Sequence, residues 1–184
     1  MPVGEVLYTI LPSNDSTLAL EVLKTRLMRR KKHTLFFENF RGEFSYFPER
    51  PEASRVNLTI DARSVICRDP WLKTRKQQLV TNYVRNEGLS ADDHPEIRFA
   101  STRIYRKPIR GFVVEGVLTV RGVGRTVKVN VVLNPMKHGR VQIDGDATFC
   151  LSDFGVRPPS SMFGLIGTKD EALVRLLLWA TQVE

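Results

Sequence analysis

The sequence predicts a mainly β protein, a barrel or a sandwich, with about eight antiparallel strands and one amphipathic helix. Strand patterns bounded by turn residues recur at short intervals along the chain, which is typical of such folds. Between His94 and Leu133, three β-patterned segments are joined by basic, glycine-containing turns with no helix between them. These strands must be antiparallel, because a parallel crossover needs a dozen or more residues.

The first third of the chain contains four segments of this kind. Residues 8–11 form a short opening strand, and residues 17–24 form a second strand whose helical propensity also predicts a helical turn at residues 25–28. An aromatic segment follows at residues 33–47. Residues 55–65 show the cleanest alternation of apolar and polar side chains in the chain, which predicts a half-buried antiparallel strand.

One segment has helical spacing instead. Its apolar residues recur over several turns at Trp71, Leu72, Leu79, Tyr83 and Val84, which predicts an amphipathic helix at about residues 70–86. Asp69 and Pro70 are suitable residues for its cap and first turn. The remaining expected strands are residues 97–104, 111–121, 126–133, 141–151 and 172–183.

The last of these strands is apolar on both faces. One face carries Leu173, Leu177, Trp179 and Val183, and the other carries Val174, Leu176, Leu178 and Ala180. We expect one face to line the inside of the fold. The other face needs a cover, either the helix or the partner subunit of a homodimer, because monomers seldom expose such stripes to water.

Length and composition indicate one domain spanning residues 1–184. With 184 residues and 42% hydrophobic content, the chain can bury one good core but is short for two. The N-terminus lacks the pattern of a signal peptide, so we expect a cytoplasmic protein, or a periplasmic one if a leader was removed. A formal charge of +8 attracts anions without distinguishing phosphates, nucleic acid and acidic lipid surfaces.

Several motifs together resemble the YceI-like family. They are FRGEF at residues 40–44, RVNLTIDARSV at 55–65, HPEIRF at 94–99, VEGVLTVRGVGRTVKV at 114–129 and SDFGV at 152–156. The resemblance implies a single lipocalin-like antiparallel β-barrel with a long apolar tunnel. It also implies noncatalytic binding, storage or transport of a polyisoprenoid, an isoprenoid quinone or a fatty acyl lipid. The basic run at residues 29–33 departs from the family pattern.

On that resemblance, the inward faces of the strands are expected to line the tunnel. An eight-stranded barrel can hold one elongated ligand, but its interior can equally be filled by side chains, so a packed core is the alternative. The expected lining residues are Leu20, Val22, Phe37, Leu58, Ile60, Phe99, Phe112, Val114, Leu118, Val129, Phe149, Phe163 and Trp179.

A basic cluster offers a candidate site for the head group of the lipid. Arg29, Arg30, Lys31 and Lys32 could hold an anionic head or touch an acidic membrane surface transiently while lipid is loaded. A solvated charge run on a loop is the plain alternative. The loop at residues 157–171 has apolar tips and could cover the tunnel mouth, although a disordered loop fits its composition nearly as well.

No pattern of residues indicates catalysis. His33, His94 and His138 are far apart in the sequence, and Cys67 and Cys150 lack close partner spacing, so we expect no metal site, no disulfide framework and no enzyme activity. We expect no cofactor apart from a bound lipid. The alternative function is an anion- or nucleic-acid-binding module that uses the basic surface, but the aromatic residues fall mainly on core positions instead of forming stacking platforms.

Overall fold

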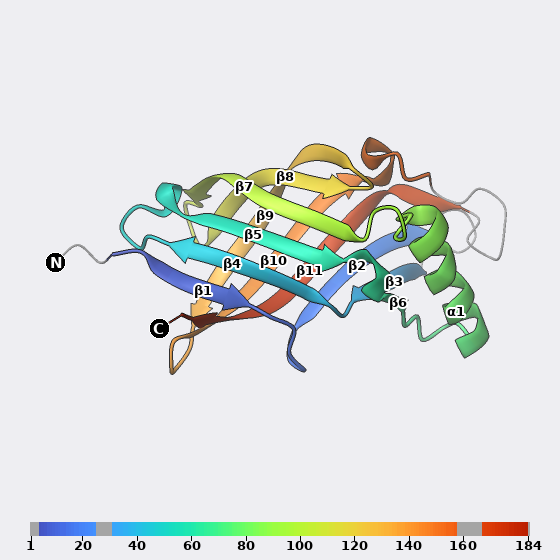
Figure 1. Ribbon diagram of the computed structural model, residues 1–184, viewed down its shortest axis with the longest axis horizontal. Coiled ribbons are helices and arrows are strands. Elements are labelled where there is room, and N and C mark those ends of the chain that lie inside the picture. Colours follow the sequence, from blue (N-terminus) through green and yellow to red (C-terminus); the bar gives the residue numbers. More distant parts are fainter. Residues whose placement is uncertain (1–3, 25–30, 158–166, 184) are drawn as a thin grey trace.

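The computed structural model describes residues 4–24, 31–157 and 167–183, which form a barrel elongated along one direction (Figure 1). Its strands are β1 (Val6–Ile10), β2 (Thr17–Lys24), β3 (Lys32–Phe37), β4 (Phe40–Tyr46), β5 (Arg55–Asp61), β6 (Val65–Cys67), β7 (Glu96–Arg106), β8 (Phe112–Val120), β9 (Val123–Pro135), β10 (Arg140–Cys150) and β11 (Thr168–Gln182). Every neighbouring pair is antiparallel.

Eight of the strands close into a barrel, in the order β1-β4-β5-β7-β8-β9-β10-β11. The closing pair is β1 with β11, where Tyr8 lies opposite Gln182 and Ile10 lies opposite Ala180. The strands β2, β3 and β6 continue the same wall toward the helix, because β2 pairs with the earlier part of β11 and β1 with its end. The expected antiparallel barrel is therefore confirmed.

The strand expected at residues 55–65 is interrupted in the structure. The strand predicted at residues 55–65 stops at Asp61, whose side chain accepts a hydrogen bond from Arg63 N at 2.9 Å and starts the 3-10 turn Ala62–Ser64. Ala62 is fully buried in this turn, so the apolar alternation continues through a bend that is not extended. The aromatic segment likewise divides into β3 and β4.

The helix lies across one end of the barrel (Figure 1). It comprises α1 (Thr74–Tyr83) and a π-helical segment, Val84–Gly88, so it begins four residues later than the predicted 70–86. The expected role of Asp69 as its cap is wrong, because Lys73 is the N-cap residue and no side chain caps it. Thr81 ties the helix to β6 by accepting a hydrogen bond from Cys67 N at 2.9 Å.

The later strands follow the expected pattern, with ends that differ from the expected ones by up to four residues. The tight reversal between β8 and β9 has Arg121 and Gly122 at φ 53° and 75°, a left-handed conformation that glycine adopts without strain. The last strand starts at Thr168 instead of residue 172. The helical turn predicted at residues 25–28 and most of the 157–171 loop lie outside the described residues. Within the described part of the chain, no helix is long and apolar enough to cross a bilayer.

Candidate functional site

The barrel encloses a cavity of about 260 Å³, which we call the barrel cavity. Its walls are almost entirely apolar side chains that project inward from strands all around the barrel. Well-packed protein interiors leave few voids larger than a water molecule, so this volume is far more than a packing defect. An engineered apolar cavity of about 150 Å³ already binds benzene. The barrel cavity therefore has room for an apolar ligand or a segment of one.

Most of the residues predicted to line a tunnel do face the barrel cavity. Eleven of the thirteen line it: Leu20, Val22, Phe37, Leu58, Ile60, Phe99, Phe112, Val114, Leu118, Val129 and Phe149. Phe163 lies outside the described residues. Contact between these side chains and a ligand stays a prediction.

Trp179 does not line the cavity, which corrects the expected inward face of β11. Its neighbour Leu178 is 3% exposed and lines the wall, and the two-residue period of a strand turns Trp179 outward. There the indole Nε1 donates a hydrogen bond to Asp15 O at 3.3 Å, and the Arg140 guanidinium lies 4.5 Å from the ring centroid. The inward face is the one that carries Val174, Leu176 and Leu178.

Aromatic rings gather at the barrel end that is remote from the helix. Tyr8 stacks on Phe44 with ring centroids 5.0 Å apart, Phe44 lies 5.7 Å from Tyr46, and Tyr46 meets Phe112 edge-on at 6.3 Å. Burial, aided by the nearby Tyr46, raises the pKa of Tyr8. The rings of Phe44, Tyr46 and Phe112 line the cavity, so this end of the barrel cavity is apolar and aromatic.

The opposite end, beside α1, contains a buried polar cluster of His33, Cys67 and Asp69. His33 Nδ1 lies 2.6 Å from Asp69 Oδ2, and the Cys67 thiol donates to the same oxygen at 3.2 Å. The other carboxylate oxygen, Oδ1, accepts Thr34 N–H at 2.7 Å. All three residues of the cluster are less than 5% exposed, and His33 also lines the barrel cavity.

Burial and hydrogen bonding set the protonation of this cluster. Burial alone would raise the pKa of Asp69, but hydrogen bonds from His33, Thr34 N and Cys67 outweigh it and hold that pKa below its ordinary value. Asp69 is therefore a carboxylate at neutral pH. Burial raises the pKa of Cys67 to about 12, so its thiol stays protonated and acts as a hydrogen-bond donor.

Lys24 and Trp71 complete the surroundings of the cluster. Lys24 is 1% exposed, and its Nζ lies 5.6 Å from the centroid of the Trp71 ring. Burial lowers the pKa of Lys24, while the negative charge of Asp69 acts in the opposite direction. The Trp71 ring lies 5.2 Å from the His33 ring and its Nε1 donates to Lys32 O at 3.0 Å. Sequence reasoning missed this cluster because His33 lies 36 residues before Asp69 in the sequence.

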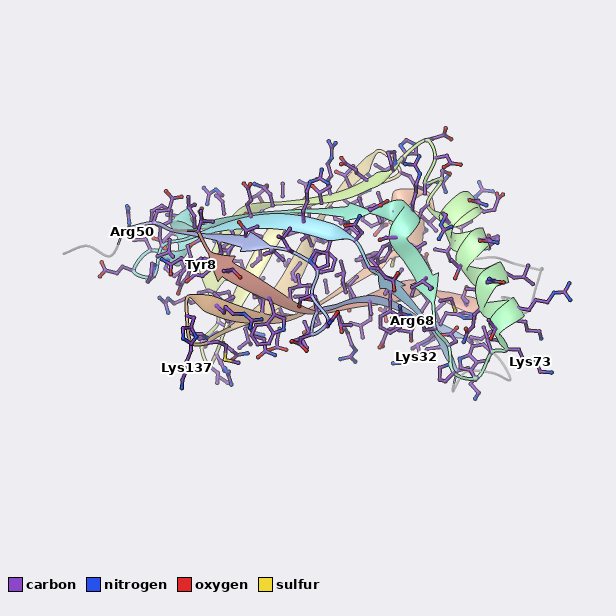
Figure 2. All side chains as sticks on the ribbon, turned by 60° about the horizontal axis from the view of Figure 1, so that its bottom comes forward. Tyr8, Lys32, Arg50, Arg68, Lys73 and Lys137 are labelled. Atoms are coloured by element: carbon purple, nitrogen blue, oxygen red, sulfur yellow. The ribbon has the colours of Figure 1, made fainter. Side chains whose placement is uncertain are left out.

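The predicted basic cluster lies partly outside the described residues, since only Lys31 and Lys32 are described. Lys32 Nζ forms an ion pair with Glu21 at 2.7 Å, and Lys31 Nζ lies 5.8 Å from the centroid of the Trp71 ring. Figure 2 shows Lys32, Arg68 and Lys73 at the helix end of the barrel, while Lys137 lies at the other end. Another exposed cation, Arg157, lines the cavity itself. Positive charge therefore surrounds the polar end of the barrel cavity.

The buried cluster also has the donor atoms of a metal site. One ligand atom each from His33, Cys67 and Asp69 lie within 4.8 Å of one another. One feature disfavours a cation there: the buried Lys24 ammonium interacts with the same carboxylate. The described contacts fit a hydrogen-bonded group better than a metal centre.

Comparison with known proteins places these features in a family. The model of the YceI-like domain matches residues 8–176. A UPF0312 protein of Pseudomonas savastanoi pv. phaseolicola is 27% identical over 135 residues, covering 67% of this chain and 63% of that protein. A UPF0312 protein of Shewanella baltica is 28% identical over 126 residues, covering 66% and 62%. The chain thus spans less than two thirds of the length of these relatives.

Solved structures share the fold. BcnA of Burkholderia cenocepacia has a TM-score of 0.73 at 20% identity, covering 90% of this chain and 96% of that chain. A polyisoprenoid binding domain from Saccharophagus degradans, implicated in plant cell wall breakdown, has a TM-score of 0.69 at 13% identity, covering 95% and 98%. The YceI protein of Campylobacter jejuni has a TM-score of 0.59 at 18% identity, covering 82% and 85%. At these identities the likeness concerns the fold alone.

Proposed function

The chain belongs to the YceI-like domain family, and on that premise we propose that it binds a long-chain amphiphile in the barrel cavity as a noncatalytic carrier or storage protein. The observation that carries the proposal is the apolar cavity of about 260 Å³ inside a closed barrel. The ligand class that fits is a polyisoprenoid, an isoprenoid quinone or a fatty acyl lipid. The name of the Saccharophagus degradans neighbour, a polyisoprenoid binding domain, supports the first of these.

Transfer of the ligand's hydrocarbon chain from water supplies the binding free energy. Each buried methylene contributes about 0.8 kcal/mol, so a chain of many carbons binds tightly without strong polar contacts. The two ends of the cavity differ, with aromatic rings at one and His33, Arg157 and nearby cations at the other. An amphiphile therefore fits with its tail toward the Tyr46 and Phe112 rings and its head toward α1.

The chemistry of the buried cluster supports a noncatalytic role. A thiol nucleophile must ionise, yet burial raises the pKa of Cys67 to about 12. The protonated thiol donates a hydrogen bond to Asp69. His33 Nδ1 is held by Asp69 and not by the thiol. The cluster consequently lacks the thiolate and base arrangement that covalent catalysis requires.

Native mass spectrometry of the freshly purified protein, followed by organic extraction, tests the proposal. A stoichiometric adduct whose extract is a long-chain lipid is the expected result. A mass equal to that of the polypeptide alone, persisting after incubation with quinones and prenyl lipids, would overturn it. Binding of lipid and of nucleic acid measured at rising salt concentrations distinguishes the carrier function from the nucleic-acid alternative. Binding to a phosphate backbone weakens steeply with salt, whereas binding that buries a hydrocarbon chain persists.

A further inference from the structure

His33 is a deeply buried polar residue that lines the helix end of the barrel cavity. It is 4% exposed and belongs to the inward-facing row of β3, together with the lining residues Leu35 and Phe37. Its Nε2 atom is buried and has no hydrogen-bond partner among the described residues. Buried polar atoms of native proteins are usually paired, and each exception calls for an explanation.

Asp69 determines what this Nε2 atom can bind. The carboxylate only accepts hydrogen bonds, so His33 Nδ1, 2.6 Å from Oδ2, must carry the hydrogen of that contact. In a neutral imidazole the second nitrogen is then an acceptor with a free lone pair. An imidazolium would instead direct a charged N–H donor toward an almost wholly apolar wall, which is unfavourable. The network therefore favours Nε2 as a hydrogen-bond acceptor.

We propose that His33 Nε2 accepts a hydrogen bond from a hydroxyl group at the head of the bound hydrocarbon chain. The ligand class is a long-chain alcohol or phenol, such as a polyprenol or a quinol, and not the corresponding ether, hydrocarbon or anion. Asp69 acts as a positioning residue that fixes the orientation and the tautomer of the imidazole. This inference rests on the proposed carrier function and adds the chemistry of the head group.

The neighbouring groups support a neutral head at His33. A phosphate or carboxylate oxygen would face the Nε2 lone pair, so an anionic head is repelled there. Such a head would instead lie near the exposed cations of the same end, which are Lys31, Lys32 and the cavity-lining Arg157. With a hydroxyl at His33, the chain extends past Leu35 and Phe37 toward the middle of the barrel.

The test compares two probes of the same chain length, geranylgeraniol and its methyl ether, by displacement of a fluorescent lipid. Both have similar apolar surface, but only the alcohol can donate a hydrogen bond. The wild-type protein should bind the alcohol about tenfold more tightly than the ether, the effect of one hydrogen bond to a buried acceptor. In the His33→Leu variant this ratio should fall to about one while the ether binds as before.

A second variant, Asp69→Asn, gives a response that simple loss of structure would not produce. Thr34 N–H donates to Oδ1, so it should keep the amide oxygen on its side and turn the amide nitrogen toward His33. The amide then donates to Nδ1, and the imidazole hydrogen moves to Nε2. An Nε2 donor should bind the ether several-fold more tightly than the wild type does, while the alcohol, which can also accept, changes little.

Thr34→Val is the matched control, because it keeps the backbone N–H that donates to Asp69. Its affinity for the alcohol relative to the ether should equal that of the wild type. Circular dichroism and thermal unfolding verify that each variant is folded. A wild-type ratio near one, or a tenfold ratio that survives in folded His33→Leu, would overturn the His33 site while leaving the carrier function intact. Failure of the wild type to bind either probe would overturn both proposals.

Discussion

The ring of Phe99 on β7 lies over the backbone of Gly116 on the neighbouring strand β8. A Cβ atom built on Gly116 would come within 2.6 Å of Phe99 Cζ and 2.5 Å of Ala100 O. Real side chains do not approach this closely, so the position requires glycine to accommodate the ring. Phe99 lines the barrel cavity, and Gly116 thereby helps to shape the cavity wall.

Gly116→Ala should destabilise the protein. The added methyl group must displace both the Phe99 ring and the Ala100 carbonyl, and overpacking of this kind lowers the free energy of unfolding by about 1–3 kcal/mol. Urea denaturation followed by circular dichroism measures the change. Gly88→Ala is the control, because a Cβ there would lie no closer than 3.8 Å to its neighbours. Equal stability of the wild type and Gly116→Ala would show that the ring moves freely.

Leu118→Arg should abolish uptake of a fluorescent lipid. Leu118 lines the barrel cavity, so an arginine there places a charge among apolar side chains and fills part of the space that the lipid needs. Val117→Arg is the matched control, since Val117 is the preceding residue of β8, is 38% exposed and faces the other side. Unchanged uptake by folded Leu118→Arg would contradict binding in the cavity.

The two-residue alternation explains why most of the cavity wall was predictable. On β8, Val114, Leu118 and Val120 share the inward face, as their spacing indicates. The choice of face for Trp179 was not predictable in this way, because β11 is apolar on both sides. The pairing of β11 with β1 and β2 decides which side looks inward, and this pairing is not a local property of the sequence.

The buried cluster of His33, Cys67 and Asp69 also could not be predicted from local sequence patterns, because it forms between residues that are distant in the sequence. His33 and Asp69 are 36 residues apart, and the sequence around Asp69 resembles the start of a helix. The carboxylate instead turns to β3, where it accepts Thr34 N–H, and the helix starts later without a side-chain cap. Only the folded barrel shows that these residues meet beside the cavity.

Replacing the four residues of the basic cluster with glutamine should weaken the binding of lipids with anionic heads more than the binding of neutral lipids with the same chain. The substitutions are Arg29→Gln, Arg30→Gln, Lys31→Gln and Lys32→Gln. Each cation near an acidic surface contributes about 1 kcal/mol, so affinity for the anionic lipid at low salt should fall about tenfold or more. Fluorescence titration with both lipids measures the difference.

The control removes the same charge from the opposite end of the barrel, where Figure 2 places Arg50 and Lys137. Its substitutions are Arg50→Gln, Lys107→Gln, Arg110→Gln and Lys137→Gln. If this variant loses as much affinity for anionic lipids as the first, then the total charge of the chain matters and the basic cluster is not a head-group site.

Asp69 should make the folded state sensitive to acid. Its pKa is lower in the folded protein than the ordinary 3.8, so the folded state binds its proton less readily than the unfolded chain. The resulting stabilisation is fully present above the unfolded pKa and is lost as pH falls through the folded pKa. Asp69→Asn should therefore be less stable than the wild type at about pH 6, and this difference in stability should be smaller at about pH 3, below the ordinary pKa.

Urea midpoints at both pH values measure this difference in stability, with Asp15→Asn as an exposed control for the change in charge. A constant difference between the wild type and Asp69→Asn across this range would mean that the carboxylate gains nothing from His33, Thr34 and Cys67.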